Sequence, residues 1–374
     1  MGGAAFEPGA VLAALARYPP LPAAGARVAV VGGFVRDIWL GREPRELDLV
    51  VEGDAATLAR SLGGEVVVHE PFGTATASGA GWRVDLAMAR RESYASPGAL
   101  PEVEPASIEE DLARRDFTVN AIAVTVEGGE LLASRDALDD LSTGTLRVLH
   151  ERSFIDDPTR LLRLARYAER LGFAVEPWTG GLAEQATLET LSAGRLGGEL
   201  RLALAESDPV AVLTRLSDKL PLAIDSTLAD CALSLAPADS DRAMLLLGLL
   251  SSQERWLADL ELTAHEHLVA LACQRAGVPA DLTPSALWRA WHGTPVEAVA
   301  AAGARGAREA ARRWIEELRH VRLQIGGDEL LAAGIPQGPQ IGRRLQRTLE
   351  AKLDGQLTGG PEEELAHALG QAEP

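Results

Sequence analysis

The chain has 374 residues, of which 47% are hydrophobic and 24% charged, so it is too long for one ordinary core and too apolar for disorder. We expect two to four packed segments. The sequence contains no uncharged apolar run of about 18 residues and no basic signal-peptide start. Cys231 and Cys273 lie far apart in helical patterns, which predicts buried free thiols. These features exclude a membrane protein and a disulfide-rich secreted domain, and they predict a cytoplasmic protein.

The net charge of −18 argues against a nucleic-acid partner when it is taken alone. Two segments depart from this trend, because 147–170 carries six arginines against four acidic residues and 301–350 carries nine against six. Contacts with phosphates require only a locally basic surface. A solvated helix face explains each segment almost as well, so charge leaves both interpretations open.

Short strands and turns are predicted between residues 27 and 145. The apolar run from Arg27 to Gly33 is typical of a buried strand that ends in a glycine turn, and 34–40 is typical of a helix that Gly41 ends. Further strands are expected at 47–51, 65–69, 74–78 and 82–88. The segment 90–108 has no periodicity and several prolines and glycines, so we expect a loop, longer than a simple connection requires.

Helical periodicity replaces the strand signals from about residue 146 to the end of the chain. Strands followed by a long run of helices indicate an α+β protein. We divide the chain into a head, 1–145, and three all-helical segments, which are a neck at 146–215, a body at 216–300 and a tail at 301–374.

Acidic residues on two predicted strands form a candidate metal site. Glu46 and Asp48 flank Leu47, and residues at i and i+2 of a strand share one face. Asp85 could join them from an adjacent strand. Carboxylates that share one face repel each other and need a cation, for which Mg²⁺ is the natural choice beside substrate phosphates. An exposed edge strand with acidic side chains directed to solvent is the simpler alternative for the acidic pair alone.

Two glycines stand between the first strand and the first helix of the head. Gly32 and Gly33 would let backbone N–H groups approach a triphosphate closely, at the N-terminal end of a helix. Arg36, in the first helical turn, could add a positive charge, and Asp37 follows it. The acidic strand comes shortly afterwards, and this order makes the combination far more specific than a glycine pair by itself.

Four segments together resemble one enzyme family, the class II tRNA nucleotidyltransferases and the related bacterial poly(A) polymerases, whose catalytic core is similar to DNA polymerase β. The resemblance covers about 27–175 and returns in the tail. The segments are GGFVRDIWLG with ELDLVVEGDA, RRDFTVNAIAV, DDPTRLLRLARYAERLGF, and the tail sequence GDELLAAGIPQGPQIG.

The resemblance implies roles for residues of the head. Glu46 and Asp48 would hold two Mg²⁺ ions, with Asp85 as a third catalytic carboxylate. The family usually has aspartate where this chain has Glu46, which is one methylene longer. The segment RRDFTVNA, 114–121, would recognise the ribose and the triphosphate. The spacing does not tell which of its two arginines reaches the triphosphate. The implied nucleotide-binding residues of the head are Gly32, Gly33, Arg36, Asp37, Arg114, Arg115, Asp116 and Asn120.

The resemblance also implies that Asp157 and Arg160 pair with the Watson–Crick edge of the incoming base, in place of a nucleic-acid template. An acceptor beside a donor suits cytosine and adenine and leaves unpaired polar groups against guanine and uracil. Arg163 and Arg166 would hold phosphates or brace this pair. Helix capping by Asp156 with a basic helix face is the purely structural alternative.

The sequence therefore predicts stepwise addition of C, C and A to the 3′ end of tRNA from CTP and ATP, with Mg²⁺ as cofactor. Arg343 and Arg344, at the start of a tail helix, are expected to contact tRNA phosphates. The full-length 90–108 segment favours addition of the terminal A, because relatives that add only CC have this region shortened. The alternatives are a relative that adds only A, only CC or poly(A), and a non-catalytic RNA-binding paralogue. The oligomeric state is not predicted.

Overall fold

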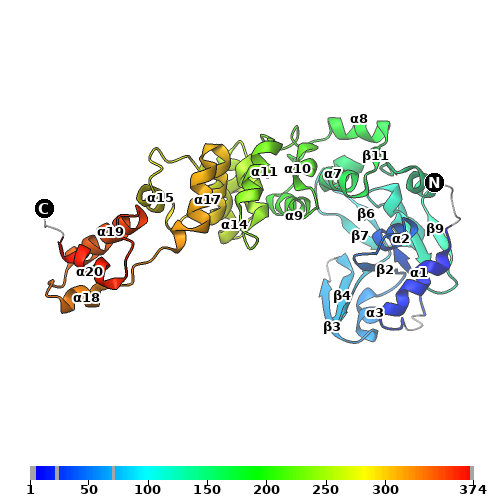
Figure 1. Cartoon of the computed structure of the whole chain (residues 1–374). Helices are drawn as coiled ribbons and strands as arrows, with labels where there is room; N and C mark the ends of the chain where they lie inside the picture. Colours follow the sequence, from blue (N-terminus) through cyan, green and yellow to red (C-terminus); the bar gives the residue numbers. More distant parts are fainter. Residues whose placement is uncertain (1–5, 22–24, 70–71, 371–374) are drawn as a thin grey trace. The chain divides into compact units, whose positions relative to one another are not determined.

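The computed structural model describes residues 6–21, 25–69 and 72–370, and the chain divides into two compact units, Met1–Val212 and Leu213–Pro374 (Figure 1). The predicted head and neck both belong to the first unit. The predicted body and tail lie in the second unit. The boundary between the units falls within helix α10 (Pro209–Thr214), near the end of the predicted neck.

The described part of the first unit contains a seven-stranded mixed sheet with the strand order β3-β4-β5-β2-β1-β8-β9. Strands β2 and β5 are parallel, and the other neighbours in this sheet are antiparallel. The five strands expected from the sequence are therefore confirmed. The strands are β1 (Val28–Val31), β2 (Leu47–Val51), β3 (Glu65–His69), β4 (Thr74–Gly79), β5 (Trp82–Met88), β8 (Ile122–Thr125) and β9 (Leu131–Ala133).

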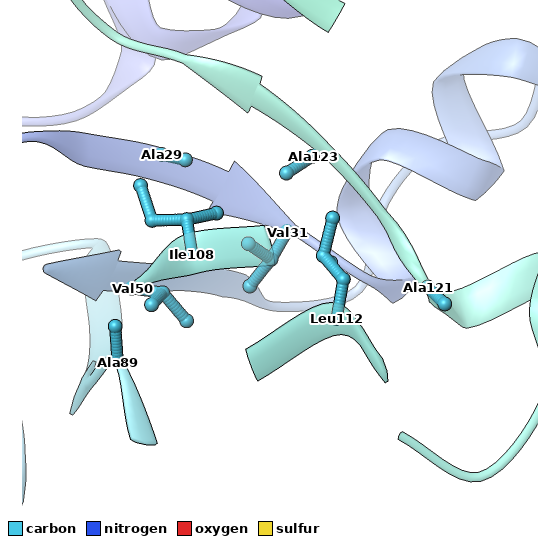
Figure 2. Packing of buried hydrophobic residues seen from close by; sticks show 8 residues of the cluster. All are labelled: Ala29, Val31, Val50, Ala89, Ile108, Leu112, Ala121 and Ala123. Atoms are coloured by element: carbon cyan, nitrogen blue, oxygen red, sulfur yellow. The ribbon is translucent and has the colours of Figure 1, made fainter. Parts of the chain in front are cut away.

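The centre of this sheet is buried on both faces, which explains why β1 is a continuous apolar run without alternation. Helix α4 (Ile108–Ala113) covers one face, and Figure 2 shows its side chains Ile108 and Leu112 beside Val31 and Val50 of the sheet. Ser107 and Glu110 form a capping box that fixes the start of this helix. The edge strand β3, in contrast, alternates between exposed and half-buried residues.

The segment 90–108 is more ordered than the predicted loop. Strands β6 (Arg90–Ser93) and β7 (Glu102–Pro105) pair as an antiparallel ribbon, and α4 begins at Ile108. The ribbon was not predicted because its strands are short and rich in charged residues, and β6 has no hydrophobic residue. We call 90–105 the hairpin and 94–101 its tip.

The remaining elements of this unit are mostly helices. The longest helix of the neck, α7 (Thr159–Leu171), ends at Gly172, which adopts the left-handed conformation. A short parallel pair, β10 (Thr145–Leu146) with β11 (Ala174–Val175), interrupts the expected all-helical region. The other helices of this unit are α1 (Pro8–Ala14), α2 (Gly33–Trp39), α3 (Ala55–Ser61), α5 (Ala137–Thr143), α6 (Ser153–Asp156), α7 (Thr159–Leu171), α8 (Pro177–Gln185) and α9 (Ala193–Leu204).

The second unit is helical, as expected. Cys273 is buried and Cys231 half-buried, and both are free thiols. Within the described residues, the helices all fall short of the length and apolar character that crossing a membrane requires. The helices are α11 (Ser226–Leu235), α12 (Arg242–Leu250), α13 (Glu254–Asp259), α14 (Ala264–Arg275), α15 (Pro284–Trp291), α16 (Val296–Ala302), α17 (Arg308–Glu316), α18 (Gly327–Ala332), α19 (Pro339–Leu353) and α20 (Pro361–Gly370).

The close packing of α12 on α14 depends on Gly248, since a Cβ there would lie 2.1 Å from the carbonyl oxygen of Ala270. We therefore expect Gly248→Ala to lower the free energy of unfolding by about 1–3 kcal/mol, because the two helices must separate. Gly342→Ala in α19, where a Cβ would meet nothing within 4 Å, is the control and should stabilise by up to about 1 kcal/mol. Chemical denaturation measures both changes, and equal stability of the Gly248 variant and the wild type would contradict this packing.

Candidate active site

A cavity of about 910 Å³ lies in the first unit, lined by strands of the sheet, the hairpin, α2, α7 and α9. All fifteen residues that the sequence analysis assigned to catalysis or nucleotide binding line it. Among the described residues, its wall contains ten arginines and seven acidic side chains. A chain with a net charge of −18 thus concentrates positive charge in one concave site, which suits a polyanionic ligand.

Carboxylates stand on neighbouring strands at one end of this cavity. Asp48 of β2 and Asp85 of β5 are directly paired in the parallel register, so their side chains share one face of the sheet. Asp85 accepts hydrogen bonds from the Thr76 hydroxyl at 2.5 Å and from Arg83 at 3.1 and 3.2 Å. Glu46 precedes β2 and is exposed.

The electrostatic surroundings of Asp48 favour a bound cation. Burial raises the pKa of Asp48 to about 6, Arg115 acts against this rise, and the charges of Asp85 and Glu46 add to it. A positive ion would relieve this penalty directly, because it stabilises the ionised carboxylate.

The donor set suits Mg²⁺ bound together with a triphosphate. Within the described residues, no three His, Cys, Asp or Glu side chains form a group that could hold a metal ion. Mg²⁺ commonly uses one or two carboxylates and completes its shell with phosphates and water. Asp48 with Glu46 supplies such a partial set, and Asp85 is already held by Thr76 and Arg83.

The glycine turn beside these carboxylates leaves room for an arginine. Gly32 has φ of 64°, and a Cβ at this position would lie 2.8 Å from Nη1 of Arg115. Any other residue would therefore be strained and would displace Arg115. Gly33, the first residue of α2, lies against the guanidinium of Arg36.

The structure separates the roles of two consecutive arginines that the spacing could not distinguish. Arg114 is bound on both sides, since Nη1 donates to Glu92 at 2.7 Å and Nη2 to Asp111 at 2.6 Å. Arg115 also pairs with Asp111, at 3.0 Å, but it lies beside Gly32 and acts on the charge of Asp48. Arg115 is therefore the better placed of the two to meet a triphosphate near the carboxylates.

A buried polar network connects the neck with α2 through the RRDFTVNA segment. Arg163 donates to Oδ2 of Asp116 at 2.8 Å, Asn120 donates to Oδ1 at 3.0 Å, and Arg36 donates to Asn120 at 2.5 Å. Burial by itself raises the pKa of Asp116, but Arg163 and the hydrogen bond from Asn120 outweigh it and lower the pKa to about 2. Arg36 also pairs with Asp37, at 2.7 Å. These side chains are held rigidly at the cavity wall.

Asp157 and Arg160 both line the cavity, and different neighbours hold each of them. Asp157 accepts hydrogen bonds from the backbone N–H and the hydroxyl of Thr159, the first residue of α7. It also accepts one from Arg195 of α9 at 2.6 Å. Arg160 is buried and donates to the Ser153 hydroxyl at 2.7 Å and to the backbone carbonyl of Arg114 at 2.6 Å. The capping expected of Asp156 is therefore wrong, because Asp156 ends α6 and pairs with Arg152, whereas Asp157 accepts from the first N–H group of α7 and also lines the cavity.

The remaining predicted residues differ in their environment. Arg166 donates to Glu199 at 3.0 Å and to Glu206 at 3.2 Å, which fits the bracing role rather than a phosphate contact. In the second unit, Arg344 donates to the backbone carbonyl of Ala368 at 2.7 Å and ties α19 to α20. Arg343 is exposed on α19.

Tyr167 and Arg195 are among the residues of the cavity wall that sequence reasoning missed. Tyr167 lies among three guanidinium groups, with Arg36, Arg163 and Arg170 at 5.4, 5.5 and 4.7 Å from its ring centre. Its place four residues after Arg163 on one helix was the available signal. Arg195 had no signal, because it lies 38 residues after Asp157.

Comparison with known proteins agrees with this geometry. Residues 28–147 match the family model described as "Poly A polymerase head domain". An A-adding tRNA nucleotidyltransferase of Geobacter sulfurreducens is 34% identical over 381 residues, covering 88% of this chain and 43% of that protein. Further relatives are named CC-adding tRNA nucleotidyltransferase, from Deinococcus radiodurans, and multifunctional CCA protein. The chain spans about half the length of the curated relatives it matches.

Solved structures match nearly the whole chain. A CCA-adding enzyme in an apo form is 31% identical with a TM-score of 0.80, covering 92% of both chains. A CCA-adding enzyme of Thermotoga maritima in complex with tRNA is 29% identical with a TM-score of 0.73, covering 92% of this chain and 91% of that one. Together with the polymerase-β-like head and the helical segments, these matches place the chain in the tRNA nucleotidyltransferase family, whose head is of the poly(A) polymerase type.

Proposed function

We propose that this chain transfers nucleotides from CTP and ATP to the 3′ end of tRNA and releases pyrophosphate. One observation supports this proposal above the others: the carboxylates of Asp48 and Asp85, the Gly32 turn with Arg115, and the Asp157–Arg160 pair line one arginine-rich cavity. Solved relatives are described as complexes with tRNA, with CTP and with ATP.

In the proposed reaction the terminal 3′-hydroxyl of tRNA attacks the α-phosphate, and pyrophosphate leaves. Glu46 and Asp48 would hold Mg²⁺, which when bound supplies positive charge to the attacking hydroxyl and to the leaving group. Arg115 would bind the triphosphate beside the Gly32 turn, and Asp85, fixed by Thr76 and Arg83, would maintain the negative field of the site. The network of Asp116, Asn120 and Arg163 would provide the polar partner of the ribose 2′-hydroxyl.

The proposed product ends in A. The hairpin is present at full length, and its tip contacts the neck through Gly98, whose N–H donates to the Ile155 carbonyl at 3.3 Å. We favour complete CCA addition. The second candidate is addition of A alone, which the names of the A-adding relatives favour.

The neck, body and tail boundaries at 146–215, 216–300 and 301–374 remain part of this proposal, with base selection in the neck and tRNA contacts in the tail. Arg343 is the better candidate for a tRNA phosphate contact, because Arg344 is bound to carbonyls of α20. A tRNA-processing role fits the cytoplasmic location expected from the sequence.

Two tRNA substrates test the proposal and separate its alternatives. A complete CCA enzyme extends tRNA that lacks its last three nucleotides with CTP, and it extends tRNA ending in CC with ATP. An A-adding enzyme uses only the second substrate, and a CC-adding enzyme only the first. Failure on both substrates would leave the non-catalytic RNA-binding paralogue as the better account.

The hairpin supplies a sharper form of this test. Replacing Ala95–Leu100 with a short Gly-Ser turn keeps β6, β7 and the Glu92–Arg114 pair but removes the contacts of Gly98. We expect C addition to continue and A addition to fall by about tenfold or more, as when one positioning element of a site is lost. Single-turnover extension of both tRNAs measures the two rates. Normal A addition by this variant would mean that the hairpin only covers the sheet edge and has no role in A addition.

Asp48→Ala should abolish nucleotide addition while the fold persists. Loss of a group that stabilises charge in the transition state typically lowers the rate by about 10²–10³-fold. Asp54→Ala is the matched control, because Asp54 lies just beyond β2 and caps α3 outside the cavity. Glu46→Asp should retain or raise activity. An inactive Glu46→Asp beside an active Glu46→Ala would contradict the proposed ligand role of Glu46.

Arg160→Ala should impair base selection more than chemistry, because in the proposed site Arg160 reads the base together with Asp157, whereas Glu46 and Asp48 serve the reaction. Incorporation of GTP and UTP relative to ATP and CTP should rise by about tenfold or more, the scale at which a lost polar partner changes selectivity. Initial rates with each nucleotide provide the ratio. A slower enzyme with the same ratio would assign Arg160 a structural or phosphate-binding role.

A further inference from the structure

Arg195 of α9 is the residue that holds the carboxylate of Asp157 in place. Its Nη2 donates to Oδ1 of Asp157 at 2.6 Å, and its Nη1 donates to the carbonyl of Gly98 at 3.0 Å. Both side chains of the ion pair are largely shielded, with 23% and 21% of their surface exposed. One guanidinium thus bridges the hairpin tip and Asp157.

The contacts of Asp157 distinguish its two oxygens. Oδ1 accepts three hydrogen bonds, from the backbone N–H of Thr159 at 3.1 Å, from the Thr159 hydroxyl at 2.6 Å and from Arg195. Oδ2 accepts no hydrogen bond from the described residues. The carboxylate therefore has one saturated oxygen and one oxygen that remains available on the cavity side.

The contacts of Arg160 leave a complementary group. Its Nη1 is used by Ser153 and lies 3.5 Å from Nε2 of His150, and its Nη2 is used by the carbonyl of Arg114. Among the described residues, Nε has no hydrogen-bond acceptor. The pair of Asp157 and Arg160 therefore presents one acceptor and one donor, both held by hydrogen bonds to neighbouring residues.

We propose that Arg195 is a positioning residue that enforces discrimination against guanine and uracil by fixing the orientation of the Asp157 carboxylate toward the base. An ionised carboxylate accepts from the amino group of cytosine or adenine, and it has nothing to offer the carbonyl oxygen of guanine or uracil. This inference rests on the proposed function, since it assumes that Asp157 and Arg160 read the base.

The physical reason is the loss of constraint when Arg195 is removed. Thr159 alone would remain on Oδ1, and its two donors lie on one side of the carboxylate. The carboxylate could then turn away from its orientation and admit water, which can bridge to a carbonyl oxygen of the wrong base. An arginine with no such role would act only as a partly exposed ion pair, with little effect on stability and none on selectivity.

The anchor of Arg195 at the hairpin tip is itself closely packed. Gly98 has φ of 73°, and a Cβ there would lie 2.6 Å from the carbonyl oxygen of Thr190. Gly98→Ala should therefore shift the tip and one anchor of Arg195, while the ion pair with Asp157 can persist. This substitution tests the bridge without removing the positive charge.

The experiment measures kcat/KM for ATP, GTP and UTP on tRNA ending in CC, a substrate that both complete CCA and A-only enzymes extend. Arg195→Met should raise the GTP/ATP and UTP/ATP ratios by about tenfold or more. The KM for ATP should rise while kcat stays within about threefold, because Arg195 touches no reacting atom. Arg195→Lys, which keeps the positive charge near Asp157, should recover most of the discrimination. Gly98→Ala should give a smaller loss than Arg195→Met.

Arg27→Met is the matched control, because Arg27 joins two segments of the same unit through Glu52 and Glu109 and lies outside the cavity. Its ratios should equal those of the wild type. Unchanged ratios in Arg195→Met, with A addition intact, would overturn the role of Arg195 and leave the proposed function standing. No A addition by the wild type would overturn both. Should Arg195→Met fail to fold, Arg195→Gln carries the same test, because it removes the charge but keeps a polar side chain.

Discussion

The Arg163–Asp116 ion pair is the interaction on which the rest of the site depends. It joins α7 to the segment that follows α4, and through Asn120 it reaches Arg36 at the start of α2. The position of α7 relative to α2 is therefore set by charged groups that are buried together. Breaking such a pair leaves an uncompensated buried charge, which is strongly destabilising, so the network can hold the site rigid.

This arrangement also explains how an acidic protein can present a site for polyanions. Apart from Arg45, the arginines of the cavity come from α2, the hairpin, the RRDFTVNA segment, α7 and α9. Neighbouring carboxylates bind most of them. These carboxylates orient the guanidinium groups and reduce their mutual repulsion. The positive surplus is local, and the net charge of the chain carries no information about it.

The hairpin shows how a segment without apolar periodicity can still be ordered. Glu92 accepts from Arg90 and Arg114, and the tip meets the neck at Ile155, Thr190 and Arg195. Polar contacts across long sequence separations hold the hairpin. No window of the sequence contains both partners of such a contact, so the sequence predicts only a long loop.

The sequence by itself determined the class of fold, five strands of the head, and fifteen of the residues that line the cavity. It could do so because buried strands need continuous apolar runs, glycine turns need glycine, and the motifs keep functional residues at short spacings. The tertiary structure decided which partner each side chain has. It gave Arg115, and not Arg114, a place beside Gly32, and it bound Arg344 to the carbonyl of Ala368. It also brought Arg195 into an ion pair with Asp157, 38 residues earlier in the chain. Hydrogen bonds act over about 3 Å in space whatever the separation along the chain, and only the folded arrangement specifies that distance.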